Sequence, residues 1–474
     1  MLGVTFACTG IAAGCICNTA SADDAGNAAA SQSATTAPVA AEASVSKGFW
    51  PDLWTRQTLL GDMGGLRPWF DKYGASLALT ENSEYWGNLR GGLHHGGAYD
   101  GVTTLTFGLD TSKALGIPGG QFNVSALQIH GTSITRANLG TMNMASNDEA
   151  PASTRLWELW YQQTLLNKRV DVKIGQQSLD QEFMTSQYGA TFINAEFGWS
   201  ALSAYDLPAG GPAYPLAAPG VRVRAKITPS LTALAGVFDG NPTGNNPDNE
   251  SGTNFNLHDG ALYIGELQYA VNPPGDDGKP RQGGGLPGTY KIGVWYNNGR
   301  FADQRYAANG QSLALGGVGG PHEHHGDYSI YAVADQMLWR PDPDKPRALG
   351  AFARVTGAPG DRNLVNLAAT AGLVLSAPFK GRDNDSMGIA VTYIKVGNHA
   401  HDLDLDYLSS GAPYGVRTSE TTLEATYIWQ VTPWWTLQAD AQYTFNAGAG
   451  QNPDNPAVPL RNTFVLGLRT NIVF

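Results

Sequence analysis

Apolar and polar residues alternate at every second position through most of the chain after Gly74. In the segment TLEATYIWQ (residues 422–430), every second residue from Leu423 to Trp429 is apolar, and the residues between them are polar except for Ile428. Successive side chains of a β-strand point to opposite faces of a sheet, so this period of two indicates strands with one apolar face. The pattern therefore predicts an all-β protein.

Sixteen such segments follow one another, and the connections between them alternate between short and long. The predicted strands cover residues 75–88, 102–110, 121–131, 154–165, 170–177, 219–227, 231–238, 260–270, 289–297, 327–339, 347–357, 363–375, 386–396, 419–430, 435–445 and 462–474. The even-numbered turns are mostly tight or marked by Pro and Gly, as at 167–168 and 228–230. The longest odd-numbered loops are polar and cover residues 132–153, 178–218, 239–258, 298–326 and 397–418. An even strand count with one short-turn end and one long-loop end is typical of an outer-membrane barrel.

We therefore expect a 16-stranded antiparallel transmembrane β-barrel with a short N-terminal helical segment. Strands of about 9 to 13 residues suit a tilted crossing of a bilayer. Closure is needed because an open sheet edge in lipid leaves backbone groups unpaired. Aromatic residues near the strand ends would form girdles at the membrane interfaces, namely Trp157, Tyr161, Trp295, Tyr296, Trp339, Tyr393, Trp429, Trp434 and Trp435. A β-sandwich in the periplasm, which also alternates, is the competing interpretation.

Composition and motifs exclude several functional classes. Only 15% of the residues are charged, against about 25% in average globular chains. The formal net charge of −11 argues against a nucleic-acid partner, which requires a basic face. No G-x-S-x-G, H-E-x-x-H or phosphate-loop motif is present, so the sequence offers no catalytic residue, predicts no enzyme and calls for no cofactor.

The first 48 residues read as an export segment and a linker. All three cysteines lie within the first 17 residues, and a small-residue cleavage site at 20–22 predicts a signal peptide over 1–22. The basic start of such a signal is missing, which suggests a true start upstream of Met1. A lipoprotein acylated at Cys15 is the alternative. Residues 23–48 are rich in Ala, Ser and Thr and read as a flexible linker. No later run of 18 uncharged apolar residues predicts a membrane helix.

Residues 49–73 break the period of two and precede the barrel domain, 74–474. Within this N-terminal segment, 53–60 and 66–73 each predict a short helix. We expect the segment to pack on the short-turn end of the barrel, and a partial plug of the lumen is the other possibility.

Several motifs resemble one known family. The stretch LLGDMGGLRPWFDKYG (59–74), followed by EYWGN (84–88), is similar to the start of the carbohydrate-selective porins, the porin B group of Gram-negative bacteria. Later segments are similar to further signatures of that family in the same order: residues 173–184, 220–242, 334–366 and 372–396. The resemblance covers roughly residues 50–474. It implies a 16-stranded outer-membrane barrel for facilitated diffusion of sugars, with glucose-type monosaccharides as the usual substrates.

Strand faces predict which side chains line the pore. If Leu77 and Leu79 face lipid, then Glu84, Trp86 and Asn88 face the lumen. The fourth strand repeats the pairing of a carboxylate with an indole: Glu158 and Trp160 point inward if Trp157, Leu159 and Tyr161 point outward. A carboxylate binds sugar hydroxyl groups, and an aromatic ring stacks on the apolar face of a sugar. The simpler interpretation is that such side chains only wet a water-filled wall.

Positive charges are predicted to oppose these carboxylates across the lumen. They are Lys173, Arg222, Arg224 and Arg354, all on inward faces of predicted strands. Opposite charges facing each other disfavour ions of either sign, whereas neutral sugars still find hydrogen-bond partners.

The loop at 178–220 is far longer than a typical connection and rich in aromatic residues. Long loops without regular structure are usually functional. We expect it to fold inward and narrow the pore, with Asp180, Glu182, Glu196 or Trp199 near the constriction.

The cluster PHEHHGD (321–327) resembles a metal site in composition, but it sits in a Gly-rich loop, and we predict no metal there. Three functions remain open: a sugar-selective porin, a general or weakly ion-selective porin on the same barrel, and a barrel enzyme or adhesin. The expected partners are small sugars, outer-membrane lipid and the barrel-assembly machinery, for which the terminal Phe474 resembles a recognition signal. Both a monomer and a homotrimer are compatible with the sequence.

Overall fold

Sixteen antiparallel strands form one closed barrel in the computed structural model. The structure describes residues 52–244, 246, 249–273 and 285–474; the predicted signal peptide and linker lie outside these residues. Each strand pairs with its neighbours in sequence, and β1 pairs with β16 to close the sheet. The strands are β1 (Ala75–Arg90), β2 (Gly96–Asp110), β3 (Gly120–Gly131), β4 (Ser153–Leu165), β5 (Val170–Gln177), β6 (Ala218–Lys226), β7 (Leu231–Asp239), β8 (Ala261–Val271), β9 (Gly288–Ala307), β10 (Pro321–Trp339), β11 (Ala348–Gly357), β12 (Val365–Ser376), β13 (Ser386–Val396), β14 (Ser419–Thr432), β15 (Trp435–Phe445) and β16 (Thr463–Val473). The predicted fold is confirmed.

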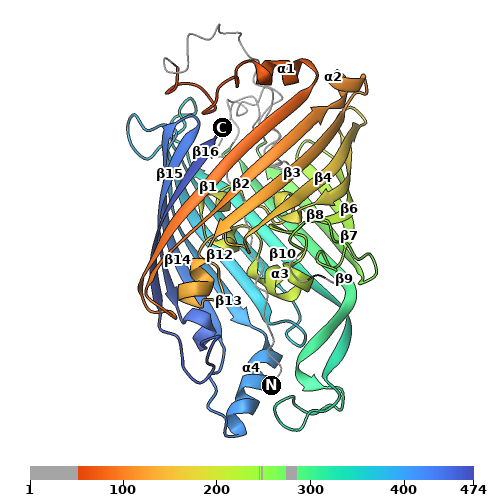
Figure 1. Cartoon of the computed structure of the whole chain (residues 1–474), viewed down its shortest axis with the longest axis vertical. Helices are drawn as coiled ribbons and strands as arrows, with labels where there is room; N and C mark the ends of the chain where they lie inside the picture. The colour runs from red at the N-terminus through yellow and green to blue at the C-terminus, as the bar shows by residue number, and fades with distance from the viewer. Residues whose placement is uncertain (1–51, 245, 247–248, 274–284) are drawn as a thin grey trace.

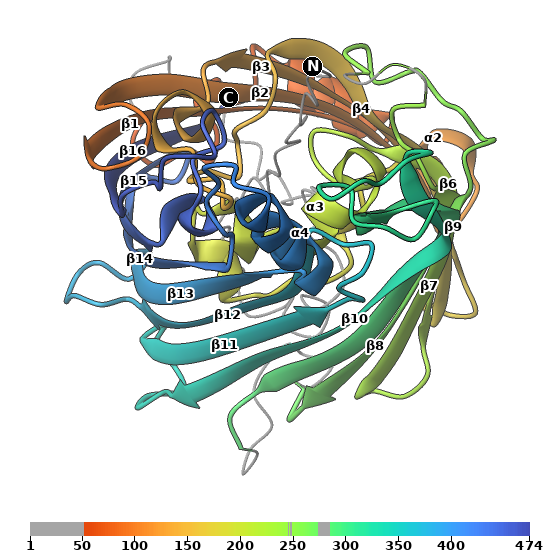
Figure 2. The same ribbon diagram turned by 90° about the horizontal axis from the view of Figure 1, so that it is seen from below.

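The described residues include four short α-helices: α1 (Leu66–Lys72), α2 (Thr111–Leu115), α3 (Ala201–Asp206) and α4 (Asn398–Ser409). Figure 1 shows α1 and α2 at one end of the barrel, where the C-terminus also lies, and α4 at the other end. Figure 2 shows α3 inside the ring of strands. Among the described residues, no helix has the length and apolar character needed to cross a membrane.

The N-terminal segment packs on the short-turn end. The backbone N–H of Leu59 donates to the carbonyl of Val473 at 2.7 Å, and the Arg67 guanidinium donates to the carbonyl of Phe474. Lys113 of α2 pairs with Asp71 of α1 at 3.1 Å. Of the two predicted helices only Leu66–Lys72 forms, and Arg67 and Asp71 tie it to Phe474 and Lys113. Residues 53–60 form turns and bends, since so short a segment is marginal as an isolated helix.

The long-loop end differs from the prediction at the ninth and tenth strands. Residues 298–326, predicted as a loop, continue β9 and β10 into a hairpin with a connection of only 308–320. β9 reaches 20 residues and β10 reaches 19. Beyond the hydrocarbon layer a strand needs no apolar face, so its extension carries no period-two signal.

Two aromatic residues expected in the girdles lie inside the barrel. A register shift between Ser125 and Ala126 of β3 turns Trp157 of β4 inward, where its ring packs edge-on against Tyr214 at 6.1 Å between centroids. Such a bulge changes the direction of the side chains that follow it. Trp295 of β9 is also inward and fully buried. The prediction took both for interface residues because they are aromatic and lie near strand ends, and the alternation in β4 had turned Trp157 outward.

Candidate functional site

The connection between β5 and β6, residues 178–217, crosses the inside of the barrel. Its backbone N–H groups donate to carboxylates on distant strands: Met184 to Glu266 of β8 at 2.9 Å, and Ile193 to Glu424 of β14 at 2.7 Å. The Ser186 hydroxyl donates to Asp335 of β10 at 2.6 Å. These strands are spaced around the wall, and Figure 2 shows the segment in the middle of the ring. The loop therefore narrows the lumen, as predicted from its length.

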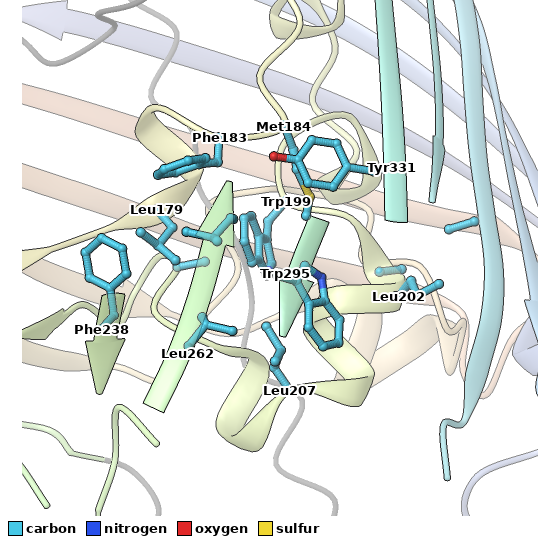
Figure 3. Close-up of a cluster of buried hydrophobic side chains, with 14 of the residues drawn as sticks. Leu179, Phe183, Met184, Trp199, Leu202, Leu207, Phe238, Leu262, Trp295 and Tyr331 are labelled. Carbon is cyan, nitrogen blue, oxygen red and sulfur yellow. The ribbon is translucent and has the colours of Figure 1, made fainter. Parts of the chain in front are cut away.

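This loop has an apolar core of its own against one side of the wall. Trp199 packs beside Trp295, Leu202 and Leu207 (Figure 3). The indole N–H of Trp199 donates to the carbonyl of Gly210 at 3.0 Å, and the indole N–H of Trp295 donates to the Ser203 hydroxyl at 3.1 Å. Trp199, predicted to stand near the constriction, is 1% exposed and supports the loop without facing the opening.

A buried cluster of ion pairs joins the start of the loop to β5 and β6. Glu182 contacts Lys173 and, at 2.6 Å, the Nε of Arg222, which also pairs with Asp171. Burial opposes the ionisation of Glu182, but Lys173 and Arg222 outweigh it and bring the pKa of Glu182 to about 2. Residues predicted separately as wall and loop positions therefore meet in one site.

A second ion pair anchors the middle of the loop. Arg354 of β11 pairs with the Glu196 carboxylate at 3.3 Å and donates to the carbonyls of Glu196 and Gly198. Both side chains of the pair are almost completely buried. Burial raises the pKa of Glu196, while Arg354 acts in the opposite direction.

Within the described part of the chain, the third predicted loop carboxyl, Asp180, has no basic partner in its hydrogen bonds. It accepts from the Ser178 hydroxyl at 2.5 Å and from the Tyr214 backbone N–H at 3.3 Å. Burial raises the pKa of Asp180 to about 7, although these hydrogen bonds favour the charged form.

The connection between β3 and β4, residues 132–152, also enters the lumen. The backbone N–H of Asn143 donates to Glu420 of β14 at 2.7 Å. Asp148 pairs at 3.1 Å with Arg469 of β16, which also contacts Glu84 of β1. Two loops thus enter the barrel, each tied to the wall through charged groups.

The predicted carboxylate and indole pairs face inward but are covered by these loops. Glu84 accepts from the indole N–H of Trp86 at 2.6 Å, and Glu158 accepts from the backbone N–H of Ser178 at 3.1 Å. The Lys173 ammonium lies 4.4 Å from the ring centre of Trp160. Asn88 donates to loop carbonyls. These wall residues are at most 8% exposed, in contrast to the predicted exposure to a water-filled lumen.

Other inward positions stay partly exposed. Arg224 keeps a side-chain exposure of 20% while its Nε donates to Asp171 at 2.7 Å. Other partly exposed inward positions carry hydroxyl or amide groups, among them Thr80, Asn82, Thr104 and Gln162.

Sequence reasoning missed the carboxylates that hold the loops. Glu266, Asp335, Glu420 and Glu424 each lie on the inward face of a strand and accept backbone or hydroxyl donors from a loop. The alternation of apolar and polar residues in the sequence already assigns these carboxylates to the inward faces of their strands. A carboxylate that alternates with lipid-facing residues must point inward, which is the signal that could have found them.

The histidine-rich segment lies on a strand and not in a loop as predicted. His324 of β10 and His399 of α4 bind the two carboxylate oxygens of Asp303 at 2.9 and 3.0 Å. Within the described ranges, no group of three or more His, Cys, Asp and Glu side chains is arranged to hold a metal ion.

A model of the carbohydrate-selective porin family, OprB, matches residues 94–474. The chain belongs to this family. Porin B of Pseudomonas aeruginosa is 25% identical over 442 residues, which is 88% of this chain and 91% of that protein. The high-pH structure of OprB from Pseudomonas putida superimposes with a TM-score of 0.78 at 24% identity, covering 89% of this chain and 99% of that one. The low-pH structure of the same protein gives a TM-score of 0.53 at 18% identity, with the same coverage.

Membership in this family makes the chain a carbohydrate porin of the outer membrane. The closed barrel with loops inside it is the corresponding architecture, that of a channel. In an OprB porin the narrowed lumen is the candidate functional site, because a solute must pass the two inward loops.

Proposed function

We propose that this porin passes neutral sugars of monosaccharide size, with glucose-type sugars as the main substrates, by facilitated diffusion. The observation that carries the proposal is the pairing of charges along the narrowed lumen. Lys173 and Arg222 are matched by Glu182, and Arg354 is matched by Glu196. Because these basic groups are buried and each is paired with a carboxylate, they offer little electrostatic attraction to an ion, while polar groups that remain exposed replace part of the water around a sugar.

We assign the direct sugar contacts to the partly exposed inward side chains, with Arg224 and Asn82 as the leading candidates. The covered residues then act as supports: Glu84, Trp86, Asn88, Glu158, Trp160, Lys173, Arg222 and Arg354 hold the loops that shape the opening. In the loop, Asp180, Glu182, Glu196 and Trp199 set its position and thereby the size of the constriction.

Liposome swelling tests the proposed function. Proteoliposomes are placed in isosmotic solutions of a monosaccharide, a disaccharide and a charged amino acid of similar size to the monosaccharide. We expect the monosaccharide to enter severalfold faster than the other two, because the lumen is narrow and its charges are paired. Equal rates for the sugar and the amino acid would replace this proposal with a general diffusion porin. Liposomes without protein are the control.

Export and assembly belong to the same proposal. We propose that residues 1–22 direct export and that the barrel-assembly machinery recognises the end of β16. The backbone N–H of Phe474 donates to the carbonyl of Leu79 at 2.9 Å, so the last residue also takes part in closing the sheet.

Deleting Phe474 is expected to lower the amount of folded barrel in the outer membrane while the inserted molecules keep their conductance. The residue lies at the short-turn end and far along the chain from the loops that narrow the lumen. Heat-modifiable migration on gels measures the folded amount, and planar bilayers measure conductance. Phe474→Tyr is the matched control, since it keeps a terminal aromatic ring. Normal insertion of the deletion variant would contradict the assembly role.

A further inference from the structure

Three exposed basic residues lie where β1, β13 and β16 reach the long-loop end of the barrel. Arg90 is the last residue of β1, and Lys395 is the last but one of β13. Arg461 lies just before β16, and its carbonyl accepts the backbone N–H of Gly92, in the connection that follows Arg90, at 3.3 Å. All three basic residues are exposed. We call them the basic rim.

Strand register shows that Arg90 and Lys395 point out of the barrel. Arg90 pairs directly with Phe464, whose two neighbours in β16 are buried. Phe464 therefore lies on the outer face, and directly opposed residues of an antiparallel pair share one face of the sheet. Lys395 is exposed between Ile394 and Val396, which are both almost completely buried. The two basic side chains thus face the surroundings of the barrel and not its lumen.

The charges of the basic rim are not compensated within the described part of the chain, where none of the three residues forms an ion pair. This is unusual for the long-loop end. Other arginines there are paired with carboxylates: Arg300 with Glu323, Arg305 with Asp402 and Asp406, Arg362 with Asp361, and Arg417 with Asp404. The chain as a whole carries a net charge of −11, so acidic residues are in excess. The positive charge of the basic rim is therefore available to a partner outside the chain.

The outer face next to the basic rim is apolar and aromatic. Leu89 adjoins Arg90, and Leu466 and Leu423 continue this surface on β16 and β14; all three are exposed. β14, β15 and β16 lie between β1 and β13 in the sheet. The rings of Tyr443 and Phe464 lie on β15 and β16 with 6.4 Å between their centroids. A ligand at this place meets cations at one end and apolar side chains along its length, which matches an anionic lipid.

The other side of the barrel presents a different surface to lipid at the same end. Figure 2 shows β8 and β9 across the ring from β15 and β16. On β8, β9 and β10, three exposed tyrosines pair directly with one another in one row, Tyr263, Tyr296 and Tyr328. Such a row is typical of the aromatic girdle that anchors a barrel in any bilayer. The basic rim adds a charged contact that this row lacks.

We propose that the basic rim binds the phosphate groups of a lipid in the outer leaflet of the membrane. The long loops of an outer-membrane barrel face the exterior of the cell, so the rim lies at the level of the head groups in that leaflet. A guanidinium group presents a fork of N–H donors that fits a phosphate, and an ammonium group adds a compact charge. Acyl chains would cover the adjacent apolar side chains, which a soluble anion could not do.

Lipid binding in uncharged detergent micelles tests the basic rim. The probe is diphosphoryl lipid A, and native mass spectrometry counts the lipid bound to the full barrel. Each cation near an anionic lipid surface strengthens binding about fivefold, so Arg90→Gln with Lys395→Gln and Arg461→Gln is expected to weaken binding roughly a hundredfold. The matched control removes three exposed cations of the short turns, through Lys168→Gln, Arg169→Gln and Lys380→Gln, and should bind like wild type.

Two further arms identify the ligand and control for folding. Lipid A without phosphates and inorganic phosphate alone are both expected to bind far more weakly than the diphosphoryl lipid. Arg90→Lys with Arg461→Lys keeps the charges and should retain most of the binding. Both triple variants should migrate as heat-modifiable bands, because the substituted residues are exposed. The proposal is overturned if the rim variant binds like wild type, if the control loses as much binding, or if either phosphate-free lipid or free phosphate binds equally well. None of these results depends on sugar transport.

Discussion

Replacing residues 180–215 by a short Gly-Ser linker is expected to raise the single-channel conductance of the porin severalfold. The segment crosses the lumen between β5 and β6 and reaches wall carboxylates as far away as Glu424. Without it, the opening would be limited by the β3–β4 connection and by the wall itself. Size discrimination in liposome swelling should weaken in parallel, so that disaccharides enter more nearly as fast as monosaccharides. Planar-bilayer recordings measure the conductance.

A shortened β9–β10 hairpin is the control for this deletion. Its connection, 308–320, lies beyond β9 and β10 at the long-loop end, and trimming it also removes loop residues. We expect no change in conductance from that variant. An unchanged conductance after deletion of 180–215 would show that the β3–β4 connection alone sets the constriction.

The double substitution Asp335→Asn with Glu424→Gln is a milder test of the same loop. It weakens two of the loop's attachments to the wall and should produce noisier channels without changing the length of the chain.

The strands could be predicted from the sequence because the bilayer imposes a regular pattern. Between the two membrane interfaces every strand must show one apolar face, and β13 and β15 were predicted to the residue. Where this constraint ends, the prediction fails. The outer parts of β9 and β10 have polar residues on both faces and were taken for a loop.

The site could be predicted in parts but not as an arrangement. The alternation along each strand correctly predicts that Lys173, Arg222 and Arg354 point inward. The length of the connection at 178–217 correctly predicts that it folds into the lumen. No local pattern says that Glu182 reaches Arg222, because that contact depends on how the loop closes on itself. Trp157 shows the other limit: one bulge in β4 reverses the face of an aromatic side chain that the alternation had placed in lipid.

Glu182→Ala is expected to cause the largest loss of stability among single substitutions in the lumen. The change removes the carboxylate shared by Lys173 and Arg222, whose side chains are 3% and 2% exposed. Asp171 remains for Arg222, but Lys173 loses its only ion pair among the described residues. Breaking a buried pair by removing one partner typically costs about 3–5 kcal/mol, since it leaves an uncompensated charge. Guanidinium unfolding in vesicles, followed by tryptophan fluorescence, measures the loss.

Glu323→Ala is the matched control for Glu182→Ala. Glu323 pairs with Arg300 at 2.8 Å, a separation like that in the buried cluster, but the two side chains are 57% and 68% exposed. Exposed pairs contribute at most about 1 kcal/mol, so this variant should unfold close to wild type.

The pH dependence of the stability difference between wild type and Glu182→Ala gives an independent check. Because the pKa of Glu182 is lowered to about 2, its ionised form stabilises the fold above the ordinary carboxyl range, and that contribution is lost as the pH falls toward 2. The stability difference between wild type and Glu182→Ala should therefore be present at pH 7 and shrink progressively below pH about 4. A difference that stays constant over this range would mean that Glu182 acts through packing and not through its charge.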